Sequence, residues 1–299
     1  ASTRAKLLPP AEMTARMRSS VAVVSTRDPT LPDRQRSLDR LLDWSLDLLG
    51  PDELLVLRRL AVVADGFDVT LAESVAGDER VPVNRVPELV WTLIDASLVQ
   101  REVGAGTSRY RLLGTVRSYV LESADVDVLA AARQRLADAL IDALGPLRPA
   151  SQRWVTAMGV ELENLRAVVD DPAVDDRIAR SLAWSIAQYH DVTSSYRSGI
   201  AEIARCIQHR PAPGPELVAL LSMQADLHLR LGEVDEAAAI VERAVALAEE
   251  VGRPVWDDTG VARTQGEIAL RRDDPVEAIR LAEAALAIGP ATPRGEARI

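Results

Sequence analysis

Apolar residues recur at the spacing of amphipathic helices through most of the 299-residue chain. The pattern is clearest over residues 37–49, where leucines occupy one side and charged residues the other. Gly50 can adopt the left-handed conformation that ends a helix, and Pro51 presets φ for the start of the next one. The second helical pattern ends near Gly66. Phe67, the single phenylalanine of the chain, is expected to fill the junction that follows.

The segment after Phe67 combines short helical patterns with a strand-like pair. Helices are predicted over residues 70–76, 87–96 and 115–123. Thr70 is expected to cap the first of them. Two runs typical of strands, 98–103 and 108–113, precede the last helix, and the glycines between them allow the positive φ values of a hairpin turn. Helices followed by a β-hairpin predict a winged-helix domain over residues 37–126.

Helical patterns also flank this predicted domain. Two longer ones, interrupted by prolines, predict an α-helical connector over residues 127–180. Within the connector, Glu161, Glu163 and Arg166 are expected on the solvent side. Residues 1–36 contain one short helical pattern followed by a polar, proline-containing stretch that is typical of a linker.

The remaining residues, 181–299, contain a repeated ladder of small side chains. Its three sets share spacings of 12 and 7 residues and comprise Ala187, Gly199 and Cys206; Ala225, Ala237 and Ala244; and Gly266, Ala278 and Ala285. Small side chains at these offsets let two antiparallel helices approach closely, as in tetratricopeptide repeats. We therefore predict three tetratricopeptide-like repeats, the last one truncated.

The composition fits a mainly α-helical fold. Aromatic residues make up only 3% of the chain, so Leu, Val and Ala must form the core, which suits packed helices better than a β-sandwich. A net charge of −10 argues against broad binding of nucleic acids, which are polyanions. The single cysteine, Cys206, excludes an intramolecular disulfide and favours a reducing compartment. No signal-peptide pattern or long apolar run is present, so we expect a cytoplasmic location.

Four stretches of the sequence resemble one group of bacterial regulators. These stretches are RQRSLDRLLDWSLDLLGPDELLVLRRLAVVADGFDV, LIDASLVQRE, SRYRLLGTVRSYVLE and ELENLRAVVDD. They are similar to the NB-ARC-like signal-transduction ATPases of the STAND class, which include antibiotic regulators and large LuxR-type regulators of transcription. The resemblance implies a winged helix and helical repeats that follow a nucleotide-binding domain. It makes residues 1–36 the tail of that domain and places ATP or ADP in an upstream segment.

Nucleotide chemistry is not expected within these 299 residues. A P-loop requires a glycine-rich run before its lysine, and Lys6, the only lysine, has none. The family's last nucleotide sensor is Met-His-Asp in related plant and animal proteins. The resemblance places Leu112, Leu113 and Gly114 there, and the two leucines are expected to close the winged-helix core. No catalytic residue set stands out, so the chain is predicted not to be an enzyme and to hold no cofactor or metal.

DNA binding by the winged helix is an alternative. The helix that precedes the hairpin would contact bases, yet residues 86–95 contain two acidic side chains and no Lys or Arg. Arg101, Arg109 and Arg111 lie on the predicted hairpin and are candidates for contact with a DNA backbone or with a neighbouring domain.

The predicted repeats offer a different surface. Folds of this type bind peptides or other domains along the first helix of each pair. By repeat position, this first-helix face, expected on the concave side of the repeats, comprises Trp184, Gln188, Asp226, Arg230, Arg263, Glu267 and Arg271. Its mixed charges suit a polar protein partner, an inducer, or another domain of the same chain. The resemblance thus implies the sensing portion of a transcriptional regulator, and a stand-alone helical-repeat adaptor is the competing interpretation.

Two histidines occupy the same position in successive repeats. His190 and His228 each follow a small residue of the ladder by three positions. A packing role explains this better than a metal site, because two ligands are too few. Cys206 replaces a small residue of the ladder and is expected to be a buried packing residue.

Overall fold

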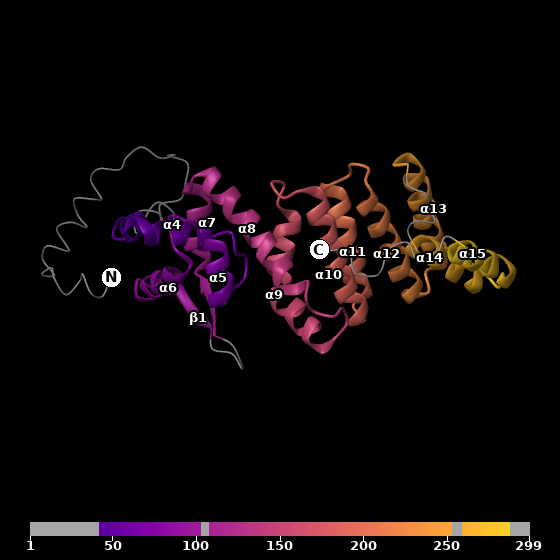
Figure 1. Ribbon diagram of the computed structural model, residues 1–299, viewed down its shortest axis with the longest axis horizontal. Coiled ribbons are helices and arrows are strands. Elements are labelled where there is room, and N and C mark those ends of the chain that lie inside the picture. Colours follow the sequence, from indigo (N-terminus) through magenta and orange to yellow (C-terminus); the bar gives the residue numbers. More distant parts are fainter. Residues whose placement is uncertain (1–41, 103–107, 253–258, 288–299) are drawn as a thin grey trace, which may run out of the picture. The chain divides into compact units, whose positions relative to one another are not determined.

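The computed structural model describes residues 42–102, 108–252 and 259–287, and these are mainly α-helical (Figure 1). The described sheet is a single antiparallel pair of strands, so the predicted fold class is confirmed. The chain forms two compact units, Ala1–Ala139 and Leu140–Ile299. The boundary between them falls inside a single helix. None of the described helices combines the length and apolar character that a membrane span requires.

The first unit follows the order expected of a winged helix. Residues 42–47 are helical. Its remaining elements are α4 (Pro51–Leu60), α5 (Val69–Ala76), a 3-10 turn (Val83–Arg85), α6 (Val86–Asp95), β1 (Val99–Glu102), β2 (Arg109–Leu112), α7 (Gly114–Ser123) and α8 (Val126–Leu144), the last of which extends into the second unit. The hairpin register pairs Val99 with Leu112 and Glu102 with Arg109. Val99 and Leu112 are buried, so one face of the hairpin closes the core.

Helix α4 ends at Leu60, so the prediction that it runs to Gly66 is wrong. The chain turns there, which buries Val62 and Val63 in the core. After the turn, Phe67 is only 1% exposed and exchanges two backbone hydrogen bonds of 2.8 Å with Tyr110. Phe67 therefore fills the junction as predicted, and it also extends the sheet by one bridge.

The N-cap of α5 also differs from the prediction. Asp68, not Thr70, caps the helix, and its carboxylate accepts a hydrogen bond of 2.8 Å from the backbone N–H of Leu71. Both residue types suit an N-cap. The helix begins one residue earlier than the apolar pattern indicates, which places Thr70 inside its first turn.

In the second unit, helices that follow one another along the chain pack against each other (Figure 1). They are α9 (Gln152–Asp170), α10 (Asp176–Val192), α11 (Tyr196–His209), α12 (Pro215–Leu231), α13 (Val234–Glu250), α14 (Thr259–Arg271) and α15 (Pro275–Ala287). The pairs α10–α11, α12–α13 and α14–α15 are those that the ladder predicts.

Small residues of the ladder lie where the paired helices touch. Ala187, Ala225, Ala237 and Ala244 are fully buried, and Cys206 and Ala278 are buried as well. Gly199 of α11 leaves little room, because a Cβ atom built there would lie 3.1 Å from His190 Cβ of its partner α10 and 2.7 Å from Leu227 Cδ1 of the next pair. Ala285 belongs to the residues whose side chains lie outside the described part.

Candidate functional site

The predicted first-helix face is spread over three neighbouring helices of the second unit. Trp184 and Gln188 lie on α10, Asp226 and Arg230 on α12, and Arg263, Glu267 and Arg271 on α14. These are the first helices of the three pairs, and α12 packs against both α10 and α14. The structure therefore places all seven residues on the helices that the sequence predicts.

Ion pairs link the charged residues of this face from helix to helix. Arg230 Nε lies 3.3 Å from Asp191 Oδ1, which joins α12 to α10. Arg263 pairs with Asp226, and the hydroxyl of Thr264 donates to the same carboxylate at 2.7 Å, so two groups of α14 bind one aspartate of α12.

Arg271 completes this network at one end of the face. Its guanidinium donates to the Leu229 carbonyl at 2.5 Å and to Glu267 Oε1 at 2.9 Å. The Leu229 carbonyl belongs to the last turn of α12, where backbone acceptors lack partners within the helix. Arg271 thus supports the packing of α14 on α12 and does not project freely from the surface.

The pKa shifts and the exposure of side chains on the first-helix face distinguish the groups that a partner can reach from those that are buried. Burial raises the pKa of Asp226, although Arg263 and Thr264 oppose the shift. The carboxylate of Asp191 is the main cause of a raised pKa at Arg230, and Glu267 and Asp226 add to it. The Arg230 side chain is still 48% exposed and Trp184 is 36% exposed. A cation and an aromatic ring are therefore open to a ligand beside a paired, partly buried acid.

The wing arginines are engaged within their own domain. Arg111 pairs with Asp65 and lies 2.7 Å from Glu102. Arg109 donates to the Gly66 carbonyl at 2.6 Å, and Arg101 donates to the Ser108 hydroxyl at 2.7 Å. Among the described residues, Arg101 has neither a carboxylate nor a backbone partner, and its side chain is exposed.

The exit of the hairpin carries no polar chemistry. Leu112 is 4% exposed and belongs to the core. Leu113 is half-buried, and its N–H donates to the Leu98 carbonyl at 3.3 Å. Gly114 begins α7. Leu112 thus closes the winged-helix core as the sequence predicts, Leu113 covers its edge, and Gly114 is exposed.

His190 and Cys206 are buried packing residues, as predicted, whereas His228 is only partly buried and binds a carboxylate. His190 is 6% exposed, neither ring nitrogen has a hydrogen-bond partner, and burial lowers its pKa. His228 lies 2.7 Å from Glu233. Burial raises the pKa of the Cys206 thiol. Within the described ranges, no group of three His, Cys, Asp or Glu side chains is arranged to hold a metal ion.

Several contacts were not predicted from the sequence. Arg166, expected on the solvent side, turns inward and donates to Glu202 Oε1 of α11 at 2.6 Å, so that prediction is wrong. Asp191 was also missed, although its place one turn after Gln188 puts it on the first-helix face. Helical spacing alone could have found Asp191, whereas the inward turn of Arg166 depends on a residue of another helix.

A comparison with models of protein families identifies the domain within the first unit. Residues 49–124 match the model described as a winged helix-turn-helix domain. The chain contains a winged helix-turn-helix domain. This domain carries the α6 helix and the β1–β2 hairpin described above.

Two relatives extend the comparison. The chain is 31% identical over 236 residues to "Putative HTH-type transcriptional regulator Rv0890c" of Mycobacterium tuberculosis, a match that covers 74% of this chain and 27% of that protein. It is 34% identical over 123 residues to "Uncharacterized protein Rv0894" of the same organism, over 41% of this chain and 31% of that protein. The chain thus spans about a quarter to a third of the relatives it matches. These similarities support a family of transcription regulators. No solved structure matches.

Proposed function

We propose that this chain is the non-catalytic regulatory portion of a multidomain STAND-type regulator of transcription. In this proposal the nucleotide-binding domain lies elsewhere in a longer protein, the winged helix couples to it, and the repeats bind a protein partner, an inducer or another domain. The supporting observation is the match to a named HTH-type transcriptional regulator. Because it covers 74% of this chain, it must include parts of both compact units.

The first-helix face is the proposed docking surface. Arg230 and Trp184 are exposed on adjacent first helices, and Asp191 and Asp226 fix the charges around them. The ion pairs hold the face in one arrangement, which lowers the entropic cost of ordering it when a ligand binds. A ligand changes the activity of the regulator only if it binds its two states with different affinities.

The regulatory role is tested in cells that carry the full-length gene. Deletion of the gene should change a defined set of transcripts, and Arg230→Glu should reproduce that change. Arg243→Glu is the matched control, because it makes the same charge change on the exposed side of α13. A deletion without any effect on transcripts would contradict the regulatory role. An effect of deletion without an effect of Arg230→Glu would contradict docking at this face.

Direct DNA binding is the second candidate, because the domain matches a winged helix-turn-helix model and Arg101 is exposed on the hairpin. An electrophoretic shift of duplex DNA at low salt, weakened by Arg101→Ala, would support it. The other two wing arginines are poor test positions, since they hold Asp65, Glu102 and the Gly66 carbonyl. Absence of any shift at low salt would exclude this candidate, because phosphate contacts are strongest there.

A further inference from the structure

The outward side of α6 has a composition that neither the winged-helix core nor DNA binding explains. Glu88, Trp91 and Asp95 follow one another at intervals of three and four residues, so they lie along one stripe of the helix. All three are exposed, and Trp91 is 55% exposed although it is the largest side chain of the helix. A large aromatic ring left in water at the centre of a helix face is typical of a contact site.

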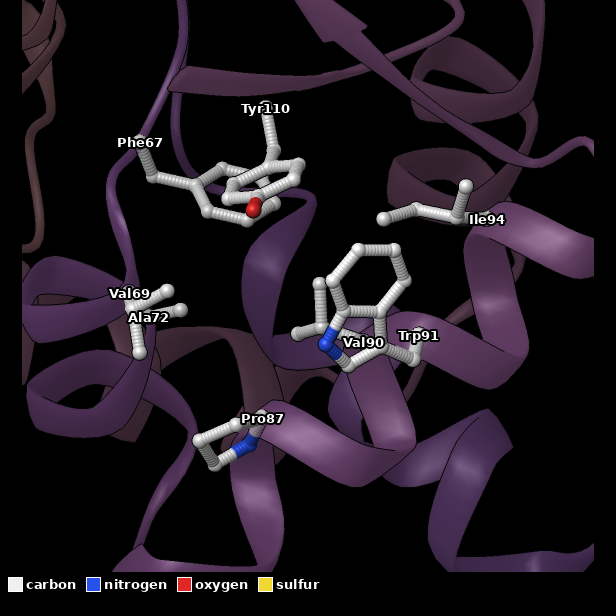
Figure 2. A pocket seen from close by; sticks show the side chains of 8 residues that line it. All are labelled: Phe67, Val69, Ala72, Pro87, Val90, Trp91, Ile94 and Tyr110. Atoms are coloured by element: carbon white, nitrogen blue, oxygen red, sulfur yellow. The ribbon is translucent and has the colours of Figure 1, made fainter. Parts of the chain in front are cut away.

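Trp91 forms one wall of an apolar hollow. Its indole ring lies edge-on to Tyr110, with 6.4 Å between ring centroids. Figure 2 shows Phe67 and Tyr110 on one side of an open centre, Val69 and Ala72 of α5 on another, and Trp91 opposite them. Only about 10 Å³ of this space is cavity, room for about one water molecule, and most of the total of about 260 Å³ is open to solvent. The hollow is therefore a shallow apolar depression, over which an apolar side chain from outside the domain can pack.

The stability of α6 explains the position of only one of the two carboxylates in the stripe. Glu88 lies in the first turn of α6, where the helix dipole favours an acid. Asp95 is the last residue of α6, where the same dipole disfavours an acid by about 0.3–1 kcal/mol. Within the described part of the chain, neither carboxylate has an ion pair or a side-chain hydrogen bond. Both are therefore free to bind an external cation.

We propose that Glu88, Trp91, Asp95 and the adjacent hollow, here called the α6 surface, bind an amphipathic helix of a partner protein. One aliphatic or aromatic side chain of that helix packs over the shallow hollow, against the exposed ring of Trp91. Arg or Lys residues on either side of it pair with Glu88 and Asp95. Seven residues of helix separate the two acids by about 10 Å. The partner must therefore place its two cations about two turns apart, with the apolar anchor between them.

The acidic charge of the α6 surface favours a basic partner helix over DNA or a second copy of this chain. The stripe is acidic and α6 contains no Lys or Arg, so a DNA backbone would be repelled. A second copy docked through a two-fold axis would place the same acidic stripe against itself. The α6 surface lies in the first unit and the first-helix face in the second, so this inference does not rest on the proposed docking role of the repeats.

The test selects ligands with the whole 299-residue chain and a displayed library of helical peptides, with the Trp91→Ala chain for counter-selection. The enriched peptides should contain one large apolar residue with Arg or Lys three or four positions before and after it. By fluorescence anisotropy, Trp91→Ala should weaken the best peptide at least tenfold. The double variant Glu88→Lys with Asp95→Lys should do the same, and it should bind a version of the peptide in which Glu replaces the flanking cations. Glu122→Lys, an exposed site on α7, is the matched charge control.

Four results would overturn the proposal. They are an absence of peptides that depend on Trp91, enrichment of acidic peptides, insensitivity to the charge reversal at positions 88 and 95, and a Trp91-dependent self-association or duplex binding in place of peptide binding. The charge-reversal variant keeps the proposal falsifiable if Trp91→Ala fails to fold, because both of its positions are exposed.

Discussion

The Arg166 guanidinium of α9 donates to the Glu202 carboxylate of α11 across 2.6 Å, in a region where Glu202 is almost completely buried. Arg205 donates to the same carboxylate. Burial lowers the pKa of the neighbouring His190; the Glu202 carboxylate opposes this shift and Arg166 adds to it. A charged contact between two helices that are not consecutive thus ties the connector to the first repeat.

Removal of the Glu202 charge should destabilise the second unit. Glu202→Gln leaves two partly exposed guanidinium groups without their shared partner, and we expect a loss of about 2 kcal/mol in the free energy of unfolding by urea titration. Glu163→Gln is the control, because Glu163 also pairs with Arg166 but its side chain is 57% exposed. An exposed pair of this kind contributes about 0–1 kcal/mol. Equal losses for the two variants would contradict the importance of the buried contact.

The stability of the second unit should fall on acidification because of His190. Burial lowers the pKa of His190 below its ordinary value of 6.5. The unfolded chain therefore takes up a proton at this site before the folded chain does, and stability falls as the pH drops below 6.5, by at most about 1.4 kcal/mol per pH unit. Above pH 6.5 this contribution is constant.

His190→Phe should remove that part of the pH dependence. The aromatic ring keeps most of the packing volume, and the two unpartnered ring nitrogens are lost. His209→Phe is the control, since His209 is exposed at the end of α11. Melting temperatures between pH 5 and pH 8 give the comparison. A wild-type chain and a His190→Phe variant with parallel pH profiles would disprove this account.

Two glycines of the ladder should respond in opposite ways to alanine. At Gly199 the added methyl group would meet Leu227 Cδ1 at 2.7 Å and His190 Cβ at 3.1 Å. We expect overpacking to exceed the helical preference for Ala, with a net loss of about 1 kcal/mol. At Gly266 the nearest atom would lie 3.9 Å away, so Gly266→Ala should gain about 0.5–1 kcal/mol. Changes of the same sign in thermal unfolding would show that the helix contacts are not as described.

Arg210 should be essential to the junction between α9 and α10. It is 5% exposed and donates to the carbonyls of Val169 and Val174 at 3.2 and 2.7 Å. Arg210→Met leaves buried acceptors unsatisfied and should cost about 3 kcal/mol of unfolding free energy. Arg177→Met changes an arginine whose side chain is 76% exposed and should be nearly neutral. Similar urea midpoints for the two variants would contradict this role.

Local sequence patterns predict much of this fold because its contacts are largely between neighbouring elements. The ladder of small residues locates the helix pairs, since Ala225 of α12 and Ala237 of α13 are both fully buried in the core that the two helices share. The hairpin follows from strand-like runs around glycines. The end of α4 could not be predicted, because it depends on the pairing of Phe67 with Tyr110, more than forty residues later in the sequence.

For the candidate sites too, the sequence predicts which helix carries a residue but not the contacts that the residue makes. Repeat position places Asp226, Arg230, Arg263 and Arg271 on the correct helices, but it does not reveal that Arg271 is bound to the Leu229 carbonyl. Likewise, the absence of cations in α6 is visible in the sequence, whereas the exposure of Trp91 beside a hollow depends on the packing of α5, α6 and the hairpin. Burial and the partners of charged groups arise from tertiary structure.

The most direct test of the docking role is site-specific photo-crosslinking in cells that make the full-length protein. A photoreactive amino acid at Gln188 lies on the first-helix face, and the same group at Arg243 lies on α13. We predict a discrete crosslinked species from position 188, either to a partner protein or to another domain of the same chain, that is lost with Arg230→Glu and is absent from position 243. Equal crosslinking from both positions, or none from position 188, would contradict the account.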